Sequence, residues 1–335
     1  MEQKYFIGID VSKEKLDLAM INSNLELVTE KIIPNSLTKI NTFFTALFRK
    51  LKISKEQVLV CCENTGIYGR PLEICCVKLG INLWVEHPLK IKKASTDMRG
   101  KSDQKDAYRI AEYVFRYSDK VVLFKESTDL IKELRTLLHV REDMIEKRAM
   151  FKNQLGEAKS HNKEQYNVLQ ACYTPLIKAL NKQLIVVEKR IDVLTDQETS
   201  VKKNIQLITS IKGIGKQNAL QFIIHTDNFQ KFTSANQLAC YSGVVPFPNQ
   251  SGTIFKRERI SKQANKKLKK LLHMAAMAAI RFNQELKEYY IRKVKEGKNK
   301  MCVINAVRNK LVHRIFSVIK RQTKFVASRE EFLSI

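Results

Sequence analysis

The sequence lacks the features of membrane and secreted proteins. No apolar run in its 335 residues approaches the ~18 residues that a membrane-spanning helix needs. Residues 1–4 lead directly into an apolar strand, without the basic segment and apolar stretch of a signal peptide. No internal repeat or low-complexity tract stands out. We therefore expect a cytoplasmic protein with no membrane partner, folded into two or three globular units.

Spaced cysteine pairs are also missing. The odd number of cysteines includes two adjacent pairs and no C-x-x-C motif, at Cys61, Cys62, Cys75, Cys76, Cys172, Cys240 and Cys302. This pattern argues against both a disulfide framework and a zinc site. Reduced thiols in the cytosol are the simple interpretation.

Acidic residues are scarce. The chain has 34 Asp and Glu against 60 Lys and Arg, for a net charge of +26. The imbalance is greatest from Thr253 to Lys324, where 21 basic residues face four acidic ones. A charge of this size favours a polyanionic partner, most plausibly nucleic acid. Any single Lys can be an ordinary solvated side chain, but a whole segment so biased predicts contacts with phosphates.

The first 120 residues or so follow the order of a ribonuclease-H-like α/β domain. Hydrophobic periodicity predicts three antiparallel strands and then alternating helices and strands. The expected strands are 4–10, 15–21, 25–33, 57–63 and 81–86, and the expected helices are 38–51, 66–79 and about 102–117. Gly80 is a helix stop and Ser102 an N-cap. The crossover helices allow the later strands to pair in parallel.

The remaining chain is expected to be mainly helical. Two leucine-rich stripes between residues 129 and 203, with a break at Tyr173-Thr174-Pro175, predict two long helices in a coiled-coil arm or a simple helical hairpin. Ile205–Ile224 contains Gly213-Ile214-Gly215, the pattern of a helix-hairpin-helix or of an ordinary glycine-rich connection. The pattern then predicts a short helix (233–242), a loop (243–256) and helices at 262–282, 285–296 and 299–323. Ser261 is the expected cap of the helix at 262–282. The expected domains are thus 1–125, 126–203 and 204–335.

The stretch from Tyr5 to Lys13 (YFIGIDVSK) is a short apolar run that ends on one carboxylate and then turns, and Tyr5–Ile9 are expected to form a buried strand. Gly8, in the middle of the strand, has no side chain, which predicts that another segment approaches the backbone there. A lone buried carboxylate is costly unless it is paired or bound to a metal, so Asp10 requires partners. Taken alone, Asp10 is more simply a turn or capping residue after a strand.

Three further acids join Asp10 as candidate catalytic residues. Glu63 ends the fourth strand, and Asp103 and Asp106 lie one turn apart on one face of the last helix of the domain. First and fourth strands are neighbours in a ribonuclease-H-like sheet, so the four carboxylates would converge. Their mutual repulsion requires cations, and hard oxygen ligands suit Mg²⁺ (or Mn²⁺) in phosphoryl transfer. The alternative is four unrelated surface acids.

These blocks carry a family resemblance. The segments IDVSK at 9–13, ENTGIY at 63–68 and KSDQKDA at 101–107 resemble the acidic blocks of the DEDD transposases. This Piv-like family is called IS-one-ten in insertion-sequence work, and its first domain is similar to the Holliday-junction resolvase RuvC. Leu238–Pro246 with Gln250-Ser251-Gly252, and RISKQAN at 259–265, resemble its C-terminal transposase domain. The family usually has Gly where Ala264 stands.

The resemblance implies a DNA recombinase that moves its own element. It implies donor and target DNA as partners, guidance by a structured non-coding bridge RNA, and assembly as a dimer, with a tetramer on DNA. It also implies that Ser251 is the nucleophile, joined to a DNA phosphate with help from the four acids and Mg²⁺. Strand exchange would then pass through a Holliday-junction-like intermediate. Acids from one subunit would work with the serine of another.

The residues alone support Ser251 less strongly. A Ser before Gly in a proline-rich loop is most often a turn residue. No histidine lies near it in the sequence, so metal activation would have to replace a base. Tyr241 is the main rival nucleophile. The expected phosphate contacts are the basic side chains of the glycine hairpin and of the segment after Ser251: Lys212, Lys216, Lys256, Arg257, Arg259, Lys262, Lys266, Lys267, Lys269 and Lys270.

Three functions compete. The first is an RNA-guided transposase and recombinase. The second is a resolvase or site-specific DNA invertase that uses the same acids without a guide RNA. The third is a basic architectural or RNA-binding protein with an inactive nuclease fold, which the intact acidic set disfavours.

Overall fold

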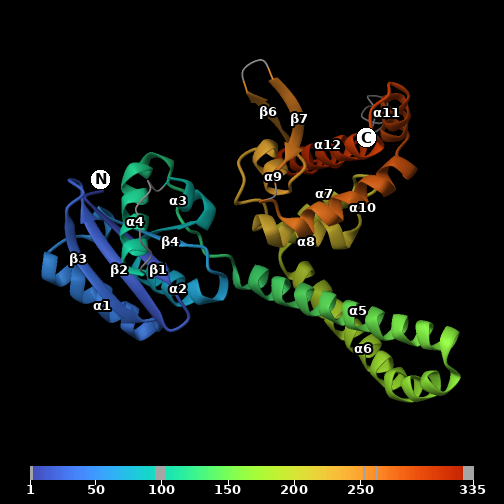
Figure 1. Ribbon diagram of the computed structural model, residues 1–335, viewed down its shortest axis with the longest axis horizontal. Helices are drawn as coiled ribbons and strands as arrows, with labels where there is room; N and C mark the ends of the chain where they lie inside the picture. Colours follow the sequence, from blue (N-terminus) through green and yellow to red (C-terminus); the bar gives the residue numbers. More distant parts are fainter. Residues whose placement is uncertain (1–2, 95–102, 252–253, 262, 327–335) are drawn as a thin grey trace. The chain divides into compact units, whose positions relative to one another are not determined.

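The computed structural model describes residues 3–94, 103–251, 254–261 and 263–326 (Figure 1). Side chains are described for all of these except 103–104, 248–251 and 254–259. The chain divides into two compact units, Met1–Glu126 and Ser127–Ile335. The arm and the basic domain expected from the sequence both fall within the second unit. Among the described residues, no helix is long and apolar enough to cross a membrane.

The first unit is built on a five-stranded mixed sheet of order β3-β2-β1-β4-β5. Its strands are β1 (Tyr5–Val11), β2 (Lys15–Asn22), β3 (Leu27–Pro34), β4 (Val58–Glu63) and β5 (Asn82–Glu86). The first three pair antiparallel, whereas β4 pairs parallel with both β1 and β5. This order and these directions fit the ribonuclease-H-like α/β domain that the sequence predicts.

Helices cover both faces of this sheet (Figure 1). Helices α1 (Leu37–Leu51) and α2 (Arg70–Leu79) share a core with Ile7 and Ile9 of β1. On the other face, α4 (Asp103–Arg116) packs with Phe6 and Trp84. Successive residues of a strand point to opposite faces, which divides β1 between the two cores. As predicted, Gly80 ends α2, with a left-handed φ of 66°.

Short elements complete the first unit. Three 3-10 turns are η1 (Lys55–Gln57), η2 (Gly66–Gly69) and η3 (Ser118–Lys120). A short helix that the sequence did not predict, α3 (Pro88–Ala94), follows β5 directly. Pro88 begins it, a position where the missing N–H of proline costs nothing. The predicted cap Ser102 lies outside the described residues.

The second unit begins with a long helical hairpin of α5 (Asp129–His161) and α6 (Lys163–Gln197). The predicted break at Tyr173-Thr174-Pro175 is wrong, because α6 continues through Pro175. The turn falls instead at Asn162, whose side chain accepts a hydrogen bond from the backbone N–H of Gln165 and caps α6. Proline removes one helical hydrogen bond, and here that loss does not end the helix.

The rest of the second unit is mainly helical. Its elements are α7 (Thr199–Thr209), α8 (Lys216–Thr226), α9 (Ala235–Tyr241), β6 (Pro246–Ser251), β7 (Ile254–Ile260), α10 (Lys266–Phe282), α11 (Gln284–Lys295) and α12 (Lys300–Arg321). Helices α7 and α8 flank the glycine segment, as a helix-hairpin-helix requires. Gly213 has φ 101°, and an added Cβ there would lie 2.7 Å from the Cβ of Ala279 on α10.

Two local predictions after Tyr241 are wrong. The expected loop 243–256 is mostly an antiparallel hairpin of β6 and β7, in which Phe247 pairs with Arg259. The long basic helix begins at Lys266, and Asn265 rather than Ser261 caps it by accepting from the N–H of Leu268. Ser261 instead accepts from the nearby N–H of Gln263.

Candidate active site

The sheet brings acidic side chains to one edge of the first unit. Ile9 of β1 pairs with Cys62 of β4, so Asp10 and Glu63 are the next residues of two neighbouring parallel strands. Glu63 in turn pairs with Glu86 at the end of β5. Residues in register share a face of the sheet, and this face is the one that α4 covers. Three carboxylates therefore stand in a row where the parallel strands end.

Gly8 brings α4 close to this row. An added Cβ on Gly8 would lie 2.1 Å from the carbonyl oxygen of Ala107 and 2.2 Å from the backbone nitrogen of Ala111. The close approach predicted at Gly8 is thus confirmed, and the approaching segment is the helix that carries the other two acids. Asp106 immediately precedes Ala107, and Asp103 lies one turn earlier at the first position of α4.

Glu63 lies close enough to two of the other predicted acids for their charges to affect its pKa. Burial raises the pKa of the Glu63 carboxyl, and the nearby Asp10 and Asp106 charges raise it further. Asp106 also forms an ion pair with Arg109, at 2.7 Å. The side chain of Asp103 lies outside the described residues, so its placement stays a prediction.

The chemistry of this donor set fits a hard divalent cation. Carboxylate oxygens are the ligands that Mg²⁺ takes. Burial and the charges of Asp10 and Asp106 raise the pKa of Glu63, and a bound cation would offset those charges. Within the described part of the chain, no group of three or more His, Cys, Asp and Glu is already arranged as a metal site. The acids predicted from the sequence to hold such an ion are Asp10, Glu63, Asp103 and Asp106.

Two buried carboxylates of the same edge were missed from the sequence. Asp17 of β2 pairs directly with Asp10, is 2% exposed and contacts the Lys15 ammonium at 3.1 Å. Glu86 is 6% exposed. Glu86 could have been recognised from the sequence, because it ends its strand as Glu63 does. Asp17 faces Asp10 once the register of the first hairpin is fixed.

The two candidate nucleophiles lie in the second unit. Ser251 is the last residue of β6 and pairs with Ile254, and its side chain lies outside the described residues. Tyr241 ends α9, and its hydroxyl oxygen accepts a hydrogen bond from the side-chain amide of Asn265, at 3.0 Å. The same amide nitrogen lies 3.1 Å from Nδ1 of His225.

His225 is the titratable member of this Tyr241–Asn265–His225 cluster. Burial lowers its pKa to about 4, with help from the nearby positive charges of Lys267, Arg135 and Lys231. The ring is therefore neutral at pH 7, and the hydrogen bond from Asn265 to Nδ1 places its proton on Nε2. Sequence reasoning missed the cluster because His225 and Asn265 lie 40 residues apart in the chain.

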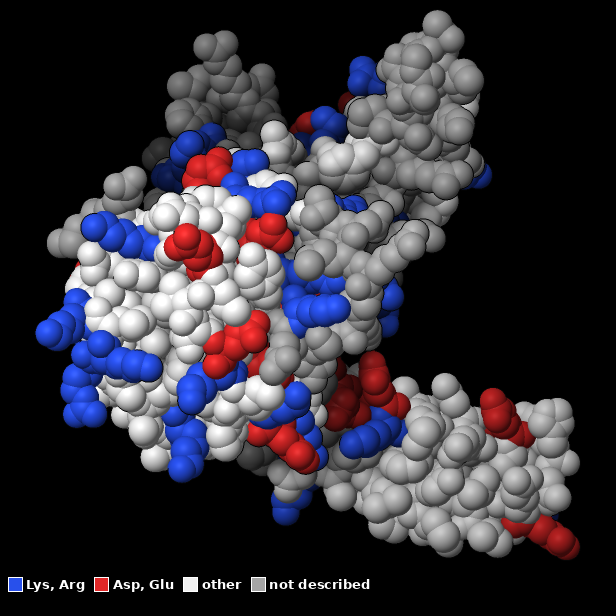
Figure 2. All heavy atoms as spheres, turned by 60° about the vertical axis from the view of Figure 1, so that its left-hand side comes forward, with Lys and Arg blue, Asp and Glu red and all other residues white. Residues whose placement is uncertain are grey.

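The structure separates the predicted phosphate-binding side chains into groups. Lys216 forms an ion pair with Asp192 at 2.6 Å, and Lys267 one with Glu142 at 2.5 Å. Lys212, Lys266 and Lys270 are exposed, and Lys269 is half-buried. The side chains of Lys256, Arg257, Arg259 and Lys262 lie outside the described residues. On the face of the first unit in Figure 2, basic and acidic side chains are interspersed.

Comparison with known proteins gives relatives along nearly the whole chain. A pilin gene-inverting protein of Moraxella lacunata is 24% identical over 328 residues, covering 96% of this chain and 98% of that protein. The transposase for insertion sequence element IS1111A of Coxiella burnetii is 26% identical over 352 residues, covering 97% of this chain and 92% of that protein. The transposase for IS1533 of Leptospira borgpetersenii is 33% identical over 112 residues, which is 33% of this chain and 31% of that protein.

Among solved structures, RuvC of T. thermophilus in complex with a Holliday junction substrate matches 36% of this chain and all of its own, with 12% identity and a TM-score of 0.30. The fold assignment rests instead on the strand order and directions. A DEDD transposase family model matches residues 7–158, and the model described as Transposase IS116/IS110/IS902 family matches residues 205–291. These two domains, in this order, place the chain in the IS110/IS116/IS902 family of transposases.

Proposed function

We propose that this transposase cuts and exchanges DNA strands with a divalent ion, Mg²⁺ or Mn²⁺, held by Asp10, Glu63, Asp103 and Asp106. The observation that carries the proposal is that strand register and the close approach of α4 at Gly8 bring Asp10, Glu63 and Asp106 to one edge of the sheet. A fold retains such a cluster at a cost in stability, and perturbed carboxylates of this kind gather at functional sites. Bound there, the ion would polarise the phosphate and activate the attacking oxygen.

We propose Ser251 as the attacking group. Its Oγ gives up a proton and forms a bond to phosphorus, while the bond from phosphorus to one deoxyribose oxygen breaks and that oxygen takes up a proton. In the reverse step, the hydroxyl of another strand end displaces the serine. No water is consumed, so the energy of the phosphodiester bond is kept through the exchange. The match of Gln250-Ser251-Gly252 to the serine block of the family supports this role.

Nucleic acid is the proposed partner of the second unit. Donor and target DNA, and a bridge RNA that pairs with both, would bind through exposed lysines such as Lys212, Lys266 and Lys270. Gly215 is the N-cap of α8 and has no side chain to accept from the first backbone N–H groups, so no capping side chain competes with a phosphate for them. Lys216 and Lys267, already paired with acids, would contribute less.

The arm is the proposed site of self-association, as a dimer and as a tetramer on DNA. Between residues 141 and 183, all of which the structure describes, Ala158 is the one buried residue. Apolar side chains in this part, including Met150, Val168 and Leu176, are about half exposed. A helical hairpin that buries so little of its apolar surface gains stability by packing against another copy.

Strand cleavage by variants of the acidic set tests the proposal. Asp10→Asn and Asp106→Asn should abolish cleavage of DNA carrying the element ends while leaving the fold intact by circular dichroism. Glu30→Gln, which removes an exposed carboxylate from β3, is the matched control and should cleave at the wild-type rate. Wild-type cleavage by either site variant contradicts the metal-site proposal.

A second candidate is a site-specific invertase or RuvC-like resolvase that works without a guide RNA. The relative named as a pilin gene-inverting protein, similar along 96% of the chain, favours it. The two candidates differ in what the purified protein carries. Co-purification of one structured RNA, encoded beside the reading frame and required for recombination, supports guidance. Full recombination by nuclease-treated protein supports the invertase.

A further inference from the structure

Glu86 is a buried carboxylate that the proposed chemistry leaves without a role. It ends β5, is 6% exposed and lies in register with Glu63 of β4. Their side chains therefore share the α4 face at the same edge of the sheet. Like charges in directly paired positions repel each other, so a buried charge at Glu86 needs its own compensation.

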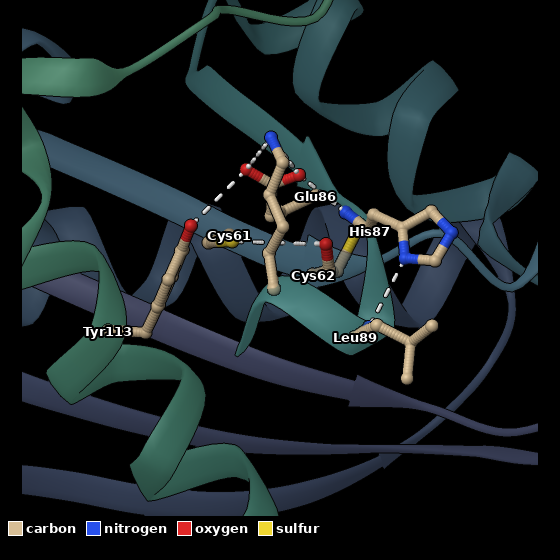
Figure 3. Close-up of polar contacts among 7 residues, drawn as sticks. Cys61, Cys62, Glu86, His87, Leu89 and Tyr113 are labelled. Carbon is tan, nitrogen blue, oxygen red and sulfur yellow. Dashed lines mark hydrogen bonds and ion pairs between the residues drawn. The ribbon is translucent and has the colours of Figure 1, made fainter. Parts of the chain in front are cut away.

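Three donors surround the Glu86 carboxylate (Figure 3). The Lys90 ammonium lies 3.1 Å from it, the backbone N–H of His87 donates at 2.6 Å and the Tyr113 hydroxyl donates at 3.3 Å. Glu63 differs from Glu86 in its surroundings. It is half-buried and lies in the row between Asp10 and Glu86. Of the two paired acids, Glu86 already has donors around it, and Glu63 is the one proposed as a metal ligand.

The bond to Tyr113 connects this edge to the catalytic helix. Tyr113 lies on α4 seven residues after Asp106, which is about two helical turns and so the same face. Its ring packs against Trp84 of β5, with centroids 5.2 Å apart. Burial and the Glu86 charge raise the pKa of Tyr113, so the phenol keeps its proton and remains a donor.

Glu86 is also tied to the end of β4. Its backbone carbonyl accepts a hydrogen bond from the N–H of Asn64, the residue after Glu63, at 2.9 Å. One residue thus contacts both the strand end that carries Glu63 and the helix that carries Asp106.

We propose that Glu86 is a positioning residue, which through Tyr113 fixes α4 against the ends of β4 and β5 and so sets the place of Asp106 relative to Glu63. It does not bind the metal ion itself, because Lys90, His87 and Tyr113 already occupy its oxygens. This inference rests on the metal chemistry proposed above.

Two variants test the link in the full chain. Tyr113→Phe removes one hydroxyl and keeps the ring against Trp84, and Glu86→Gln keeps the size and removes the charge. Tyr117→Phe is the matched control, because its ring packs on Tyr113 one turn further along. Tb³⁺ alone is the probe, since Trp84, the single tryptophan of the sequence, can sensitise its luminescence.

Both variants should raise the Tb³⁺ concentration at half-saturation on the order of tenfold, as the loss of supporting contacts around metal sites does. The Mg²⁺ needed for half-maximal cleavage should rise by the same factor, with cleavage recovered at saturating Mg²⁺. Tyr117→Phe should change neither. The double variant should be no weaker than Glu86→Gln, because the two residues form one link.

Two results would overturn the role of Glu86. One is an unchanged Tb³⁺ midpoint in both variants, even if the melting temperature falls. The other is complete loss of Tb³⁺ binding by Glu86→Gln, which would make Glu86 a ligand. Asp10→Asn distinguishes a failure of the proposed metal site from a failure of the role of Glu86. If it leaves Tb³⁺ binding intact, the proposed metal site fails, and the role of Glu86 fails with it.

Discussion

Gly8 of β1 and Ala107 of α4 meet backbone to backbone, and a Cβ on Gly8 would lie 2.1 Å from the Ala107 carbonyl oxygen. No side chain separates the strand from the helix at this point. Asp10 lies two residues further along the strand, and Asp106 one residue earlier in the helix. The contact therefore sets how far apart two of the proposed metal ligands lie.

Gly8→Ala should displace α4. The atoms that a new methyl group meets belong to the helix backbone, which cannot rotate away as a side chain can. Overpacking of this kind costs about 3 kcal/mol in free energy of unfolding, measured by denaturant titration of the full chain. Cleavage should fall together with stability. Gly156→Ala is the control, because nothing lies within 4 Å of its added Cβ, and it should keep or raise stability. A Gly8→Ala protein of wild-type stability and activity contradicts this account.

The fold of the first unit could be predicted from the sequence because its strands and helices carry strong periodic patterns. The mid-strand glycine even indicated that another segment approaches β1. Predictions failed where local signals competed. Pro175 suggested a helix end, but α6 continues through it. Just before the proline, the ring of Tyr173 packs against that of Phe151 on α5, with centroids 4.7 Å apart. The β6–β7 hairpin was missed because Pro246, Pro248 and Gly252 resemble an irregular loop.

Glu63→Gln should stabilise the metal-free protein. A carboxyl whose pKa is raised in the fold contributes stability below its unfolded pKa, near 4.5, and loses it as pH rises through the folded value. At pH 7 the charged Glu63 therefore opposes folding, and the amide removes that repulsion. We expect a higher melting temperature without divalent ions, a flatter dependence on pH above 4.5, and no cleavage.

Magnesium provides the matching control for Glu63. Mg²⁺ should raise the melting temperature of the wild-type chain and leave that of Glu63→Gln nearly unchanged. Equal stabilisation of both proteins by Mg²⁺ would show that the ion binds elsewhere.

His225 should make the protein sensitive to mild acid. Its pKa falls from an ordinary 6.5 to about 4 in the fold, so the unfolded chain takes up a proton first as pH drops. The contribution to stability is complete above pH 6.5 and is lost between pH 6.5 and about 4, by up to about 3 kcal/mol. His225→Phe should flatten the stability curve across this window. His161→Phe, at an exposed histidine, should leave the curve unchanged. If His225→Phe keeps the wild-type slope, another group is responsible.

The candidate site was less predictable than the fold. Asp10, Glu63 and Asp106 could be found because the first two lie at the ends of strongly patterned strands and the third lies near the start of a patterned helix. Glu86 could also have been found, because it ends its strand as Glu63 does, whereas Asp17 becomes a neighbour of Asp10 only through the register of the first hairpin. The Tyr241–Asn265–His225 cluster joins three separate elements, and only tertiary packing brings them together.

Removal of the outer arm should leave a folded monomer. Leu134, Leu138, Val187, Ile191 and Leu194 near its base belong to the core of the second unit, whereas residues 146–178 add little to it. A short Gly-Ser linker in place of 146–178 can join the two helices, whose axes lie about 10 Å apart. Sedimentation analysis should give a dimer or tetramer for the full chain and a monomer for the shortened one. A full chain that stays monomeric with and without nucleic acid contradicts self-association through the arm.

Ser251→Ala should keep nucleic-acid binding and lose cleavage together with the covalent adduct. A serine hydroxyl is a weak nucleophile at neutral pH and needs a base or a metal to activate it. His273, the nearest histidine in the sequence, contacts the Arg308 guanidinium. His225 is neutral at pH 7 but is engaged with Asn265, so the proposed metal site remains the candidate activator.

The adduct decides between the nucleophiles. A nicked suicide substrate traps the covalent complex, and mass spectrometry of its digest locates the attached residue. Tyr241→Phe is the matched control, because it removes the rival hydroxyl together with the hydrogen bond that Asn265 donates to it, and it should still form the adduct. An adduct on Tyr241, or recombination by Ser251→Ala, would show that the serine is not the nucleophile. Cleavage without an adduct on any residue would instead indicate hydrolysis, in which water attacks the phosphate and the energy needed for rejoining is lost.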